Sequence, residues 1–158
     1  KYAHAHAGTR DAALASGGVN ASDSVIALTE NYNGTAWGEL NDMNTARAYM
    51  GESGTNTSAL VFGGFISTDQ DLNESWNGTS WSEVADLNTA RRAMGSAGVS
   101  NTSALAFGGK APDKNETESW NGSSWTELNN LNTARSELTG NGTTTSALAF
   151  GATVKTES

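Results

Sequence analysis

The stretch Ser58-Ala-Leu-Val-Phe-Gly-Gly64, followed by Asn73-Glu-Ser-Trp-Asn-Gly-Thr-Ser-Trp81, decides the fold of this chain. The first segment is a continuous apolar run stopped by two glycines, which is typical of a strand buried on both faces. In the second segment Asn77-Gly78 is a strong hairpin signal, because both residues tolerate the positive φ of a type I′ turn. We therefore expect three antiparallel strands, at 58–62, 72–76 and 79–84.

A fourth strand precedes these three at residues 48–54. Its residues are small and weakly apolar, which suits a strand crowded near a central axis where large side chains do not fit. The polar stretch at 66–71 is predicted to be a loop. Four antiparallel strands within about 44 residues make one blade of a β-propeller.

One set of residues recurs at a fixed interval through the chain, as in repeat proteins. The motif Asn-Thr-Ala-Arg ends in an arginine every 44 residues, at Arg47, Arg91 and Arg135. The same step separates three glutamates, Glu30, Glu74 and Glu118, and three aromatic pairs, Tyr32/Trp37, Trp76/Trp81 and Trp120/Trp125. The apolar run that ends in glycine recurs too, but its position drifts by a residue or two. We therefore expect the variation in length to fall in a surface loop.

The order of these landmarks resembles the kelch repeat: an apolar run, Gly-Gly, Glu-x-aromatic, Trp, and an arginine that opens the next unit. The resemblance covers essentially the whole chain and implies an all-β fold of kelch-type β-propeller blades. The interval between the two aromatic residues is shorter than in the usual kelch repeat, and the usual tyrosine is present only as Tyr32. Near-identical repeats rich in Asn, Gly, Thr and Ser resemble those of environmental bacteria and their phages.

The repeat predicts a single domain of three full blades and part of a fourth. Their expected ranges are 1–46 for blade 1, 47–90 for blade 2, 91–134 for blade 3 and 135–158 for the partial blade. Propellers usually have about four to eight blades. Two chains could complete an eight-bladed ring, one chain could close four imperfect blades, or the chain could be a segment of a longer array. We favour the segment.

Composition narrows the range of partners. The chain has 17 acidic and 9 basic residues, and its net charge of -8 repels phosphate backbones and anionic lipids. No apolar run approaches the roughly 18 residues that cross a bilayer. The chain has no cysteine, which removes thiolate nucleophiles and Cys-based metal sites. We expect no nucleic-acid partner and no membrane span.

The residues that obey the repeat are predicted to build the fold. Each aromatic pair should form an apolar plate that packs between adjacent sheets, with a sugar-stacking platform as the alternative. Each glutamate should bond to a matching arginine or to backbone N–H groups, with paired catalytic carboxylates as the alternative. The structural set is Glu30, Glu74, Glu118, Arg47, Arg91, Arg135, Trp37, Trp76, Trp81, Trp120 and Trp125.

Catalytic and metal sites are not expected. His4 and His6 are alternate strand residues on one face, but two histidines without further histidines or a carboxylate cluster make a poor zinc or copper site. A catalytic site should break the symmetry of the repeat, and the sequence shows no unsymmetric cluster of His, Tyr and carboxylate around the axis. We therefore predict no enzyme activity, no metal and no cofactor.

Function should lie where the units differ most, which is between the second and third strands of each blade. These segments, 19–24, 65–71 and 110–115, should emerge on one rim as a shallow polar surface that can hold a protein segment or a glycan. The candidate binding residues are Asn20, Asp23, Asp69, Gln70, Asp71, Lys110, Asp113 and Lys114.

The first hypothesis is a non-catalytic binding or structural module. By analogy with the phage and bacterial arrays it is a surface or virion appendage used for attachment, at an extracellular or virion surface. Two alternatives remain open. The chain could be a fragment of a kelch-type oxidase or glycan-active enzyme whose catalytic residues lie outside it, or a purely structural propeller that forms oligomers.

Overall fold

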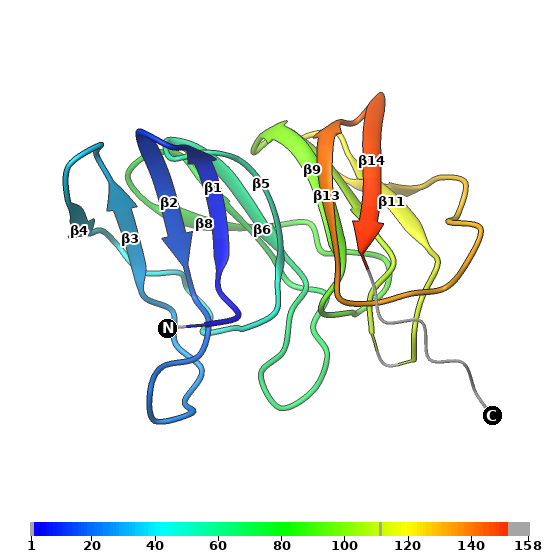
Figure 1. Cartoon of the computed structure of the whole chain (residues 1–158), viewed down its shortest axis with the longest axis horizontal. Coiled ribbons are helices and arrows are strands. Elements are labelled where there is room, and N and C mark those ends of the chain that lie inside the picture. The colour runs from blue at the N-terminus through cyan, green and yellow to red at the C-terminus, as the bar shows by residue number, and fades with distance from the viewer. Residues whose placement is uncertain (1, 111, 152–158) are drawn as a thin grey trace.

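The computed structural model describes residues 2–110 and 112–151, and every regular element within these ranges is a β-strand. The strands form three antiparallel sheets of four strands and one sheet of two strands. The sheets follow one another as propeller blades around an open arc (Figure 1). The predicted all-β fold, with three complete blades and a partial fourth, is confirmed.

The blades are built from consecutive strands. Blade 1 contains β1 (Ala5–Thr9), β2 (Ala12–Ser16), β3 (Thr29–Tyr32) and β4 (Trp37–Glu39). Blade 2 contains β5 (Gly51–Thr55), β6 (Ser58–Phe62), β7 (Asn73–Trp76) and β8 (Trp81–Val84). Blade 3 contains β9 (Gly95–Ser100), β10 (Ser103–Phe107), β11 (Thr117–Trp120) and β12 (Trp125–Glu127). The partial fourth blade contains β13 (Leu138–Thr143) and β14 (Ser146–Gly151).

The hairpin between β7 and β8 is longer than the sequence predicts. Trp76 and Trp81 are directly opposite one another, so four residues rather than two form the loop. Asn77 Oδ1 accepts hydrogen bonds from the N–H groups of Thr79 and Ser80, at 2.9 Å each. This Asx turn needs a positive φ at Gly78 alone, where φ is 94°. The expected type I′ turn is therefore wrong, and the strand expected at 79–84 starts two residues later, at Trp81.

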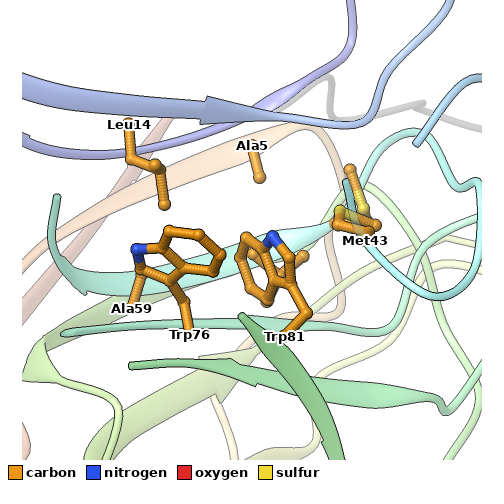
Figure 2. Packing of buried hydrophobic residues seen from close by; sticks show 8 residues of the cluster. Ala5, Leu14, Met43, Ala59, Trp76 and Trp81 are labelled. Carbon is orange, nitrogen blue, oxygen red and sulfur yellow. The ribbon is translucent and has the colours of Figure 1, made fainter. Parts of the chain in front are cut away.

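The aromatic pairs of blades 2 and 3 lie between adjacent sheets, whereas Trp37 of the blade 1 pair is exposed. The rings of Trp76 and Trp81 are 5.3 Å apart and pack against Leu14 and Ala5 of blade 1. Figure 2 shows the two indoles side by side, with Leu14 and Ala5 reaching toward them. The Trp120/Trp125 pair has the same arrangement against blade 2, with its ring centroids 5.5 Å apart. The Trp76/Trp81 and Trp120/Trp125 pairs therefore each join their own blade to the preceding one.

Backbone hydrogen bonds at the glycine pairs add a second connection between blades. The N–H of Gly64 donates to the carbonyl of Arg91, at 2.9 Å, and Gly109 makes the same bond to Arg135, at 3.0 Å. Gly64 has a φ of 108°, and a Cβ there would lie 2.8 Å from the carbonyl oxygen of Ala48. Only glycine fits this conformation and this close approach.

Candidate functional site

The loops between the second and third strands of blades 1 and 2 project from the same edge of the arc, the lower edge in Figure 1. We call this edge the loop face. The loop face carries the residues that the sequence analysis singled out for binding. Their contacts divide them into two groups.

The three aspartates in these loops are anchors. Asp23 accepts a hydrogen bond from the Tyr2 hydroxyl, at 2.8 Å. Asp69 forms an ion pair with Arg92, with 2.6 Å between Oδ1 and Nη1. Asp113 accepts a hydrogen bond from the Ser136 hydroxyl, at 2.7 Å. Tyr2 precedes the innermost strand of the same blade as Asp23, whereas Arg92 and Ser136 precede the innermost strand of the blade that follows Asp69 and Asp113.

The remaining predicted residues have mostly local contacts. Asn20 Oδ1 accepts two N–H groups of its own loop, and Gln70 Nε2 donates to oxygens of the residues just before it. The backbones of Asp71 and Lys114 bond to neighbouring loops. Lys110 differs from these four, because its Nζ lies 2.8 Å from Glu137 Oε1 at a pocket near the axis.

This pocket, which we call the mouth pocket, has a volume of about 290 Å³. It lies at the loop-face end of the innermost strands. The Tyr49 ring is exposed beside it, and the guanidinium of Arg92 lies 4.3 Å from the centroid of the Phe65 ring. Its lining residues are Tyr49, Phe65, Arg92, Ala93, Lys110 and Glu137. The mouth pocket thus combines aromatic faces with two paired cations, Arg92 beside Asp69 and Lys110 beside Glu137.

An unusual backbone conformation positions the mouth pocket. Ala3, Tyr49, Ala93 and Glu137 occupy equivalent positions and all have a positive φ, between 50° and 58°. Each of these residues donates its N–H to the carbonyl of the equivalent residue in the preceding blade. The bond from Tyr49 to Ala3 is 2.9 Å long, the bond from Ala93 to Tyr49 is 2.9 Å, and the bond from Glu137 to Ala93 is 2.8 Å. This chain of bonds links the four blades around the axis. Left-handed non-glycine residues are strained and occur often at functional sites.

The sequence analysis missed Tyr49, Arg92 and Glu137, although a signal for them exists. Tyr49, Ala93 and Glu137 each follow a repeated arginine by two residues, and they differ while the arginines are constant. Comparing units position by position around the arginines would therefore have found the mouth pocket.

A second cavity, of about 410 Å³, runs between the innermost strands β1, β5, β9 and β13. In each innermost strand, one position lies two residues before a glycine that recurs in all four blades. The residues at this position are His6, Glu52, Ser96 and Gly140. His6 Nδ1 lies 3.1 Å from Glu52 Oε1, and the N–H of Glu52 donates to Ser96 Oγ, at 3.2 Å. The sequence analysis did not single out this contact between His6 and Glu52.

The environments of the two titratable groups in this cavity differ. The His6 side chain is 78% exposed, whereas that of Glu52 is 16% exposed and its Oε2 has no hydrogen-bond partner. Burial raises the pKa of Glu52 well above its ordinary value of 4.5. The Glu52 carboxyl therefore holds its proton more readily than an exposed glutamate does. In the described part of the chain, no three His, Asp or Glu side chains gather into a group that could hold a metal ion.

Comparisons with known proteins support the fold alone. No protein-family model and no curated protein matches the chain. A solved structure titled "Structure of YjhT" is similar, with a TM-score of 0.74 and 12% sequence identity. The match covers 88% of this chain and 58% of that one, so the chain spans less than two thirds of the known structure. Together with the four-stranded antiparallel sheets, this likeness supports a β-propeller-like fold.

Within residues 2–110 and 112–151 there is no helix of the length and apolar character that a membrane span requires.

Proposed function

We propose that this chain is a non-catalytic binding module of kelch-type blades that holds a glycan in the mouth pocket. The observation that carries the proposal is the mouth pocket itself, where residues that differ between blades meet at the axis. An exposed Tyr49 ring and the stacked Phe65 and Arg92 offer apolar faces for a sugar ring. Carboxylates and cations beside these rings can bond to hydroxyl groups of the sugar.

Charge favours an uncharged sugar over an ionic ligand. Arg92 is paired with Asp69 and Lys110 with Glu137, so the cations at the mouth pocket are balanced locally. The whole chain carries a net charge of -8 and attracts no anionic polymer. At about 290 Å³ the mouth pocket lies near the lower limit of small-ligand sites, about 300 Å³. This volume fits a sugar unit better than a folded protein segment.

A glycan array followed by calorimetry with the best glycan tests the proposal. Tyr49→Ala should weaken binding about tenfold, which corresponds to about 1.4 kcal/mol. Ile66→Ala is the matched control, because Ile66 is exposed on the loop that carries Phe65 but does not line the mouth pocket. Equal effects of the two variants, or binding of peptides but of no glycan, would contradict the proposal.

A location on a cell or virion surface follows from the analogy with phage and bacterial repeat arrays. An attachment protein of this kind needs a ligand-binding face and no catalysis. Antibody labelling of intact particles or cells tests this location, and signal only after lysis would contradict it.

A second candidate function is acid–base chemistry on a glycan, favoured by the contact between His6 and Glu52. Glu52, a carboxyl of raised pKa, lies against the exposed His6 imidazole, and side chains of these two kinds serve as general acids and bases in enzymes. Incubation of the chain with the bound glycan, followed by mass spectrometry, separates the two candidates. A product that disappears in Glu52→Gln would favour the enzyme, whereas an unchanged glycan favours the binding module.

A further inference from the structure

Glu52 differs from the buried glutamates of the repeat, because no arginine or lysine faces it. The carboxylates of Glu74 and Glu118 each lie against an arginine, at 2.8 and 2.9 Å. Glu52 instead lines the cavity of about 410 Å³ between the innermost strands, which we call the axial cavity. None of the described residues that line the axial cavity is an arginine or a lysine. The Glu52 side chain, only 16% exposed, therefore has no cationic side chain opposite it.

The strands around Glu52 supply a single titratable group. The strands that pack most closely against β5 are β1, β2, β6, β9 and β10, and their one titratable side chain is that of His6. His6 Nδ1 lies 3.1 Å from Glu52 Oε1, whereas Glu52 Oε2 is buried and has no hydrogen-bond partner. A buried carboxylate is costly unless a cation or hydrogen-bond donors compensate it. A cation from outside the chain would supply that compensation.

The surroundings of Glu52 are those of a blade inside the arc. Strand β5 has β1 of blade 1 on one side and β9 of blade 3 on the other. Ser96 and Gly140 occupy the position of Glu52 in the next two blades, so the fold does not require a carboxylate there. Costly departures from local rules are expected at functional sites. The position of Glu52 therefore indicates a ligand rather than a structural role.

We propose that the axial cavity binds a small molecule through a primary ammonium group, with the Glu52 carboxylate as its counter-ion. An ammonium group carries one positive charge and three N–H donors. Oxygen atoms of the lining residues Ser96, Thr139 and Asn141 can accept the donors that Glu52 does not. The volume of about 410 Å³ lies within the range of small-ligand sites, about 300–1,000 Å³.

Charge and composition distinguish this ligand from two others. The net charge of -8 attracts cations and disfavours an anionic ligand. A metal ion fits less well than an ammonium group, because no three His, Asp or Glu side chains come together in the described residues. The axial cavity shares no lining residue with the mouth pocket, so the two sites can be tested separately.

A titration followed by the backbone amide signals in NMR spectra tests the proposal. The probe is ethanolamine, and ethylene glycol is its neutral analogue, with a hydroxyl in place of the ammonium group. Ethanolamine should shift the signals of Glu52, Gly54 and Ser96 until they saturate. Ethylene glycol at the same concentrations should leave these signals in place. Equal shifts with both compounds would overturn the proposal.

Variants assign the binding to Glu52. Glu52→Gln should weaken ethanolamine binding at least about tenfold, because it removes the charge that pairs with the ammonium group. Glu83→Gln is the matched control, since Glu83 is exposed on β8 and does not line the axial cavity, and it should bind as the native chain does. His6→Lys should also weaken binding, because it places an ammonium group of the chain beside Glu52. Unchanged binding by Glu52→Gln, or shifts of the same signals with zinc chloride but not with ethanolamine, would overturn the proposal.

Discussion

Arg47 Nη2 lies 2.8 Å from Glu74 Oε1, and both side chains are buried. The same contact recurs 44 residues later between Arg91 and Glu118, at 2.9 Å. Burial lowers the pKa of Arg47, and the nearby Glu74 carboxylate opposes that effect. Arg47 Nη1 also donates to the carbonyls of Gly63 and Leu72, at 3.0 and 2.6 Å. Arg47 and Arg91 thus each join the segment before the innermost strand to the second and third strands of the same blade.

Removing one member of the buried pair should destabilise the protein strongly. Arg91→Met leaves the Glu118 carboxylate buried without its cation, which costs about 3–5 kcal/mol. Denaturant unfolding measures this loss. Arg91→Met/Glu118→Leu should be more stable than Arg91→Met, because no uncompensated charge remains. Arg10→Met is the control, since Arg10 and Asp11 form an exposed pair. A loss equal to that of the control would contradict the structural role.

A buried tryptophan should contribute far more stability than an exposed leucine on the same blade. Trp125→Ala should lower the free energy of unfolding by about 3–5 kcal/mol, because it leaves a cavity between blades 2 and 3. Leu128→Ala should change it by less than about 0.5 kcal/mol, since Leu128 is exposed. The unfolding curves of both variants provide the measurement. Similar values for the two variants would mean that the ring does not fasten the blades.

Repetition explains how much of the fold the sequence could predict. Landmarks such as Arg91 and Trp120 recur because each blade meets its neighbour in the same way, so one unit predicts the others. The hairpin loop after Trp76 was predicted incorrectly, because Asn-Gly favours both a two-residue type I′ turn and an Asx turn, and here the Asn77 side chain forms the Asx turn within a four-residue loop.

The candidate site was less predictable, because it depends on contacts between unlike residues. His6 and Glu52 are 46 residues apart, and only the packing of neighbouring blades brings them together. Asp69 and Asp113 are 44 residues apart, the same step as the arginines, and that recurrence marks them as anchors. The prediction of a ligand-binding role for them did not take this into account.

The glycine pair should tolerate no side chain. Gly64→Ala places a Cβ 2.6 Å from Met50 Cγ, in a backbone conformation with a φ of 108°. Strain of this kind costs about 1–3 kcal/mol, and the contact with Met50 adds to it. Gly38→Ala is the matched control, because Gly38 has no positive φ of this kind and its nearest neighbour would lie 3.7 Å from the new Cβ. Thermal unfolding that leaves both variants equally stable would contradict the close approach of the blades.

Glu52 should make the stability of the protein depend on pH. Its folded-state pKa is raised well above 4.5 by burial, whereas the unfolded chain has the ordinary value. Below about pH 4.5 both states hold the proton, and the neutral carboxyl does not disfavour folding. As the pH rises toward the folded-state pKa, the unfolded chain releases the proton first, so the free energy of unfolding falls.

Glu52→Gln stays neutral and should lose this dependence. The melting temperature of the variant should exceed that of the native chain by an amount that grows as the pH rises from about 4.5 toward neutrality. Val99→Ala is the control, because Val99 lines the same cavity and carries no titratable group. Its melting temperature should run parallel to that of the native chain over this pH range. A constant difference between Glu52→Gln and the native chain would contradict a raised pKa of Glu52 in the folded protein.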